Sequence, residues 1–198
     1  NTEIPDVHYD TLCHFDYSDE EQLKLAFEYR DAEVPFVAFN IPSVEDTVKK
    51  WSDIDYLHKK MKGKKYRTET NKDNHFMYWN NGPKNNKARK KGLTDWKAPT
   101  EIEKHTFEDF VETAVKGQNQ TLEGRTYQYF RVTADKDSVY DPNNWVNEDL
   151  PIFSPNKPSL FMKEPEGKRG VHCRFGMRAI TAETHYDGSR NSIVQLGG

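Results

Sequence analysis

Helical patterns crowd the first half of this 198-residue chain, and extended patterns crowd the second half. Capped or amphipathic segments predict helices at 18–30, 42–51, 53–61 and 106–116. Alternating or β-branched runs predict strands at 34–40, 64–70, 75–79, 127–132, 159–162, 170–177, 178–186 and 191–196. This distribution is typical of an α+β fold, and the closely spaced strands of the second half favour a jelly-roll-type barrel.

Local signals predict where the helices begin and how two strands connect. Ser18 and Glu21 have the spacing of a capping box, and Thr106 stands where an N-cap is expected. The polar run 71–74 predicts a turn between the strands at 64–70 and 75–79. Trp145 and Leu150 are expected to anchor the core within an otherwise turn-rich stretch.

Composition excludes several classes of protein. Hydrophobic residues make up 34% of the chain and charged residues 31%, while 29 basic and 32 acidic residues leave a net charge of −3. That balance gives no argument for nucleic-acid binding. The two cysteines, Cys13 and Cys173, are too few and too far apart for a disulfide framework or a cysteine-rich zinc site. No apolar run approaches the length of a membrane span, and no signal-peptide pattern is visible.

His185 and Asp187 are the candidate metal ligands. Residues i and i+2 of a strand point to the same face, so an imidazole nitrogen and a carboxylate oxygen can approach one ion. Two histidines and one carboxylate form the facial triad of non-haem Fe(II) oxygenases. The pair alone is a weak signal, because Asp187-Gly188 is also an ordinary turn sequence.

The surroundings of this pair strengthen the metal interpretation. His185-Tyr-Asp187-x-x-x-Asn191 is followed by an apolar run that ends in Gly-Gly. This stretch resembles the core of the JmjC-domain, cupin-like 2-oxoglutarate oxygenases. Looser similarity extends over Val34–Asn40, Trp51, His75–Trp79 and Tyr127–Val132.

The resemblance implies a double-stranded β-helix that uses Fe(II) and 2-oxoglutarate to hydroxylate a protein side chain. It assigns the metal to His185 and Asp187, and the cosubstrate to Asn191 and to Tyr127 or Tyr129. It also implies one domain over 1–198, with a helix-rich part at 1–120 and the first part of the barrel at 121–198. In that family a distal histidine and a basic residue that pairs with 2-oxoglutarate come later, and no histidine follows His185. We therefore expect this chain to be an N-terminal portion whose iron site is incomplete.

One departure from the family leaves a second interpretation open. Several relatives carry threonine three residues before the metal histidine, where this chain has Ala182. The alternative is a cupin-like binding module without catalysis. A different cupin metalloenzyme is less favoured, because those enzymes typically show a His-x-His pattern that is absent here. Histone demethylation is also less favoured, since no zinc-finger or chromatin-reader pattern is present.

The remaining polar candidates have structural interpretations. We expect His75 and His172 to be buried and hydrogen-bonded, and Cys173 to act as a small buried hydrophobe. Arg174 and Arg178 lie near the candidate site. Either one would make a carboxylate clamp if buried, and a simple surface arginine if exposed.

Overall fold

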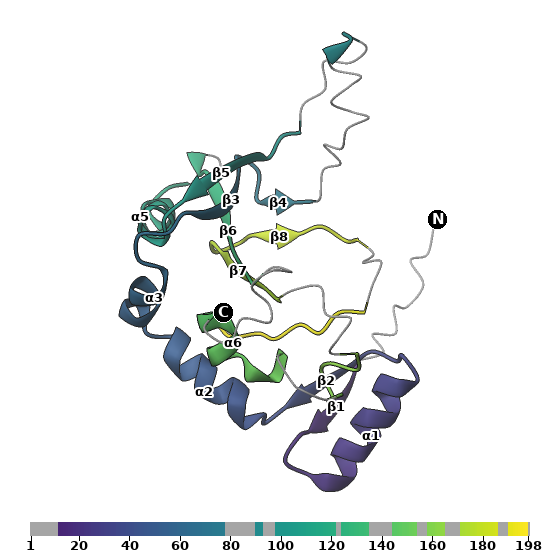
Figure 1. The fold of residues 1–198 in the computed structure, drawn as a ribbon. Helices are drawn as coiled ribbons and strands as arrows, with labels where there is room; N and C mark the ends of the chain where they lie inside the picture. Colours follow the sequence, from purple (N-terminus) through teal and green to yellow (C-terminus); the bar gives the residue numbers. More distant parts are fainter. Residues whose placement is uncertain are drawn as a thin grey trace.

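A computed structural model of the chain describes residues 12–77, 90–92, 98–121, 124–134, 144–153, 158–164, 171–185 and 190–197. These residues form an α+β fold with five α-helices, one four-stranded antiparallel sheet and two parallel strand pairs (Figure 1). The predicted α+β class is confirmed.

All four predicted helices are present, close to their predicted bounds. The helices are α1 (Glu20–Asp31), α2 (Pro42–Trp51), α3 (Ile54–Met61), α5 (Phe107–Gln118) and the additional α6 (Trp145–Asp149). Asp19 caps α1, one residue after the predicted Ser18, because its carboxylate accepts two backbone N–H bonds. Thr106 and Asp109 form the capping box of α5. No helix in the described part of the chain has the length and apolar character to cross a bilayer.

The strands predicted at 34–40, 64–70, 127–132 and 170–177 are present in their central residues. The strands are β1 (Cys13–Asp16), β2 (Phe36–Phe39), β3 (Tyr66–Asn71), β4 (His75–Phe76), β5 (Glu101–His105), β6 (Tyr127–Ala134), β7 (Val171–Gly176) and β8 (Thr181–Ala182). The main sheet has the order β5-β3-β6-β7, with every neighbouring pair antiparallel. β1 pairs with β2, and β4 pairs with β8.

The turn predicted at 71–74 is present, but the strands on its two sides do not pair with each other. β3 pairs with β5 and β6, whereas β4 leaves this sheet and pairs with β8. The side chains of the intervening turn explain the change of direction. The Asn71 amide donates to the His75 carbonyl at 3.3 Å, and the Asp73 carboxylate accepts from the His75 N–H at 3.1 Å. These local bonds favour a tight turn over a continued ladder.

Two further predicted strands are not strands in the structure. Residues 159–162 form a turn, in which the backbone groups of Ser159 and Met162 bond each other at 2.8 and 3.3 Å. Residues 191–196 have no regular structure. Side chains hold that segment instead: the Ser192 hydroxyl donates to the Phe161 carbonyl, and Val194 and Leu196 pack against the core.

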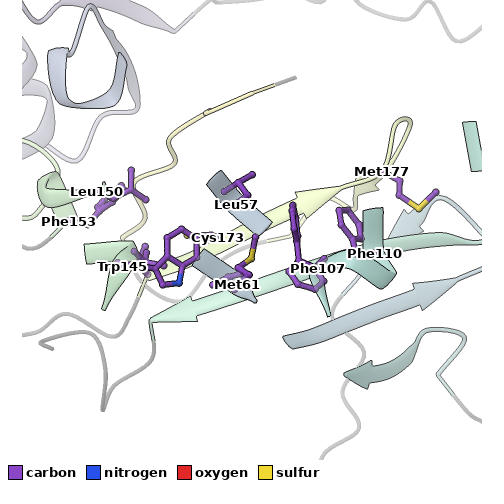
Figure 2. Packing of buried hydrophobic residues seen from close by; sticks show 13 residues of the cluster. Leu57, Met61, Phe107, Phe110, Trp145, Leu150, Phe153, Cys173 and Met177 are labelled. Atoms are coloured by element: carbon purple, nitrogen blue, oxygen red, sulfur yellow. The ribbon is translucent and has the colours of Figure 1, made fainter. Parts of the chain in front are cut away.

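The main core covers one face of the four-stranded sheet. Phe130 of β6 is fully buried, and its ring contacts Phe107 and Phe110 of α5 at centroid distances of 5.8 and 5.2 Å. Figure 2 shows the buried side chains of this cluster, most of which come from α3, α5, α6 and the sheet; Leu150, Phe153 and Met177 follow α6 and β7. The predicted anchors Trp145 and Leu150 belong to it. The other face of the sheet therefore carries the alternate residues, which are mostly polar.

Cys173 lies in this core as predicted, and its burial controls its reactivity. Burial, followed by the nearby charge of Asp149, raises the pKa of its thiol to about 12. Cys13 is exposed. We expect a thiol reagent such as DTNB to modify Cys13 rapidly at neutral pH, and Cys173 only after denaturation. Two rapidly reacting thiols in the native protein, or one in Cys13→Ser, would contradict this prediction.

Candidate functional site

The short strand β8 positions the chain that leads to His185. Backbone bonds join it to β4 at both ends: Thr181 N donates to the Asn74 carbonyl, and Glu183 N to the Phe76 carbonyl, both at 2.9 Å. A turn separates β7 from β8, so the single strand predicted over 178–186 is reduced to two hydrogen-bonded residues. Ala179 in this turn has a φ of +73°, a left-handed conformation that costs about 1–2 kcal/mol for a residue with a side chain.

His185 is exposed and has a defined tautomer. Its Nδ1 lies 2.6 Å from the carbonyl oxygen of Glu183. A carbonyl oxygen only accepts, so the proton must lie on Nδ1, and the lone pair of the neutral ring is on Nε2. A histidine that binds a metal through Nε2 commonly donates its other N–H to a carbonyl in this way. The donor chemistry of His185 therefore fits a metal ligand.

Glu183 contributes a contact that the sequence interpretation missed. Its carboxylate accepts a hydrogen bond from Nδ1 of His75, which lies on β4. His75 is exposed, so the prediction that it would be buried is wrong, although it is hydrogen-bonded. The i, i+2 spacing that predicts a shared face for His185 and Asp187 also includes Glu183. This spacing was the sequence signal that could have identified Glu183.

The two candidate tyrosines share one face of β6 but have different surroundings. Tyr127 is 3% exposed, and the guanidinium of Arg125 lies over its ring at 5.7 Å. Tyr129 is half-buried, and its ring meets Phe76 of β4 edge-on at a centroid distance of 5.7 Å. Tyr129 is thus in contact with β4 of the β4–β8 pair. The structure therefore brings Tyr129 to the strands that lead to His185.

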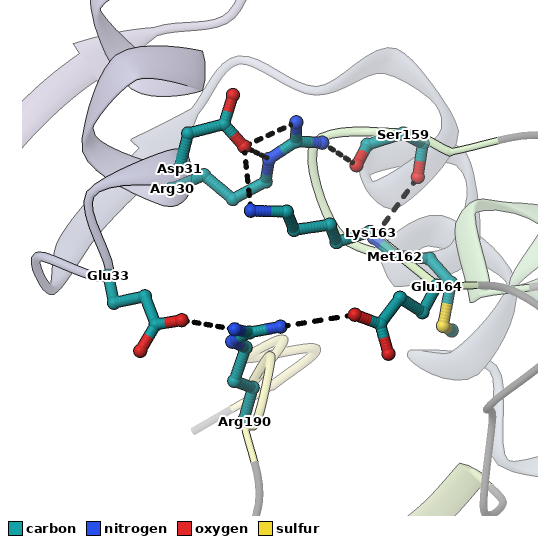
Figure 3. A network of polar contacts seen from close by, with 8 residues as sticks. All are labelled: Arg30, Asp31, Glu33, Ser159, Met162, Lys163, Glu164 and Arg190. Atoms are coloured by element: carbon teal, nitrogen blue, oxygen red, sulfur yellow. Dashed lines mark hydrogen bonds and ion pairs between the residues drawn. The ribbon is translucent and has the colours of Figure 1, made fainter.

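The segment after the candidate turn is attached to α1. The guanidinium of Arg190 pairs with Glu33, which follows α1, and with Glu164 at 3.5 Å (Figure 3). Nearby, Arg30 donates to the Ser159 carbonyl at 2.5 Å, and Lys163 pairs with Asp31 at 3.3 Å. The pairs of Arg190 connect the start of 190–197 to Glu33 and Glu164, and the other two contacts connect α1 to 159–163. Asn191 is exposed.

The structure tests only part of the predicted ligand set. Asp187 lies outside the described residues, so its position relative to His185 is not part of the structure. Within the ranges that are described, no group of three or more His, Cys, Asp or Glu side chains is arranged to hold a metal ion. His172 is exposed on β7, with its Nδ1 3.3 Å from the Thr133 hydroxyl, so its predicted burial is wrong. Arg174 and Arg178 are also exposed.

Comparison with known proteins adds no relative to this picture. No protein-family model matches the sequence, and no curated protein matches it significantly. The functional argument therefore depends on the residues around His185 and on their geometry.

Proposed function

We propose that this chain carries the first metal-binding part of an Fe(II)- and 2-oxoglutarate-dependent oxygenase that hydroxylates a protein side chain. The proposal includes a JmjC-like double-stranded β-helix, of which the antiparallel sheet and the β4–β8 pair would be parts. The observation that carries it is the contact at 2.6 Å between His185 Nδ1 and the carbonyl oxygen of Glu183, just after β8, which favours the Nδ1–H tautomer.

Each candidate residue has a role that matches its chemistry. His185 and Asp187 would hold the iron, an imidazole and a carboxylate being suitable ligands for Fe(II). The bound iron and 2-oxoglutarate would supply the activation of O₂ needed to hydroxylate a C–H bond. Tyr129 and Asn191 offer a hydroxyl and an amide that can donate to a carboxylate of the cosubstrate. Tyr127 is the second candidate for a hydroxyl donor, and it lies buried on the same face of β6.

Metal binding and turnover together test this proposal. We expect the chain to bind Fe(II) in an anaerobic titration, and His185→Ala to weaken this binding about tenfold or more. The matched control is His14→Ala, because His14 is also exposed but lies on β1 in a separate strand pair. In a protein that also contains the distal histidine and the basic residue, conversion of 2-oxoglutarate to succinate should require both iron and O₂. Unchanged metal affinity of this chain, and unchanged turnover of that longer protein, in His185→Ala would refute the assignment.

Ala182 favours the second candidate, a cupin-like module that binds its partner without iron. Ala182 is exposed on β8 and supplies no hydroxyl where several relatives of the resembled family have one. A protein that folds and contains the later part of the domain, but binds no Fe(II) and turns over no 2-oxoglutarate, would support this module over the oxygenase.

A further inference from the structure

A row of four basic residues crosses the polar face of the main sheet. The strand register places Lys104 of β5 opposite Arg67 of β3, Arg67 opposite Arg131 of β6, and Arg131 opposite Arg174 of β7. Directly opposed residues in a sheet point to the same face, with Cβ atoms about 4.5–5.5 Å apart. We call these four residues the cationic row. It runs across all four strands that lie side by side in Figure 1.

The described residues supply little negative charge to offset this row. Glu69 lies 2.9 Å from a terminal nitrogen of Arg67 and 3.7 Å from one of Arg131. Among the described residues, no other carboxylate forms an ion pair with the row. Four positive charges against one negative charge leave an excess, and like charges directly opposite each other destabilise a sheet. An anion bound to the row would relieve this repulsion.

Arg131, in the middle of the row, is the member that most clearly shows the cost of burying a charge there. Its side chain is 23% exposed, and its buried Nε has no hydrogen-bond partner among the described residues. Burial, followed by the charge of Arg174, lowers the pKa of its guanidinium. Arg174 is exposed and lies over the ring of Tyr129 at 5.3 Å, which holds its planar group against the sheet. The row thus combines a partly buried centre with accessible ends.

We propose that the cationic row binds an acidic segment of a polypeptide through its carboxylates. Guanidinium groups match carboxylates with two parallel hydrogen bonds. Four strands at their usual spacing span about 14 Å, the length of roughly five extended residues. A short acidic peptide fits this span. The phosphate backbone of a nucleic acid extends beyond the row, and there the net charge of −3 of the chain would repel it.

The row is linked to the β4–β8 pair through Tyr129. Tyr129 is two residues before Arg131 on the same face of β6, and it contacts Phe76 of β4. An acidic segment on the row would therefore run past the strand pair that leads to His185. Its identity as the oxygenase substrate rests on the function proposed above, whereas its binding to the row does not.

Fluorescence anisotropy with a labelled octaglutamate peptide tests the inference without iron or 2-oxoglutarate. We expect binding at low ionic strength that weakens at least tenfold in Arg131→Gln/Arg174→Gln. The matched control is Lys49→Gln/Lys59→Gln, which removes the same charge from exposed positions on α2 and α3 and should change affinity less than twofold. If the double variant fails to fold, Arg174→Gln alone changes an exposed side chain and should weaken binding at least threefold.

The outcomes separate this inference from the oxygenase proposal. His185→Ala should bind octaglutamate as the wild type does, even if it loses iron. Absence of octaglutamate binding, or equal loss in the lysine control, would overturn the acidic-peptide site while leaving 2-oxoglutarate turnover untouched. Tighter binding of an eight-nucleotide oligothymidylate than of octaglutamate would assign the row to nucleic acid and overturn the peptide assignment.

Discussion

Replacing Phe130 with alanine is expected to lower the free energy of unfolding by about 3–5 kcal/mol. The side chain is 0% exposed, and it touches rings on both sides of the core. Its centroid lies 5.2 Å from that of Phe110, 5.6 Å from that of Tyr66 and 6.1 Å from that of Phe175. Alanine would leave a cavity between α5 and the sheet, which the fixed strands cannot close.

Urea unfolding followed by circular dichroism measures this effect. Phe130→Leu keeps most of the volume and should cost less than about 1.5 kcal/mol. Phe39→Ala is the surface control, because Phe39 is 42% exposed and its loss should change stability by about 0.5 kcal/mol or less. If Phe130→Ala cost no more than the Phe39 control, the ring cluster would not be the core of the fold.

The helices could be predicted because their signals are local. Asp53 and Thr106 cap α3 and α5 through bonds to backbone groups two or three residues away. Leu57 and Met61 recur at helical spacing and are both buried. Each signal can be read in a short window, and the tertiary structure agrees with it.

Strand pairing could not be predicted in the same way, because it joins distant parts of the sequence. β5 (Glu101–His105) has one apolar residue, Ile102, and its burial pattern is that of an exposed edge. Nothing in its composition marks a strand, and its pairing with β3 decides its conformation. The partner of β4 is more than 100 residues away in β8, so no local signal identifies it.

The same limit applies to the candidate site. His185 was found from a pattern of neighbours, and its bond to the Glu183 carbonyl is equally local. The cationic row was not found, because its members are neighbours only through the register of four strands. Arg174 was noted as a possible clamp, but its position opposite Arg131 follows from pairing alone.

Asp149 is the second residue whose loss should be severe, because its buried carboxylate joins three helices. It lies at the end of α6 and accepts hydrogen bonds from the Trp51 indole of α2 at 2.9 Å and from the Tyr56 hydroxyl of α3 at 2.8 Å. Lys50 adds an ion pair at 3.6 Å, and the Thr47 hydroxyl donates to the Asp149 backbone carbonyl. The Asp149 side chain is only 3% exposed, so water cannot readily take its place as the acceptor for these donors.

We expect Asp149→Ala to lower the free energy of unfolding by about 2–4 kcal/mol, since it leaves two half-buried donors without their buried acceptor. Asp149→Asn keeps one acceptor oxygen and should cost about 1–3 kcal/mol. Burial, followed by the bond to Asp149, raises the pKa of the Tyr56 hydroxyl. The stabilisation that the neutral Tyr56 hydroxyl contributes is therefore fully present below the pKa of about 10 that tyrosine has in the unfolded chain, and it is lost as the pH rises further.

Urea unfolding at pH 7 measures the stabilities of Asp149→Ala and Asp149→Asn. The control is Asp46→Asn, which removes one partner of an exposed ion pair and should change the free energy of unfolding by about 0.5 kcal/mol or less. Equal stability of Asp149→Ala and the Asp46 control would mean that α2, α3 and α6 are held together by apolar contacts alone.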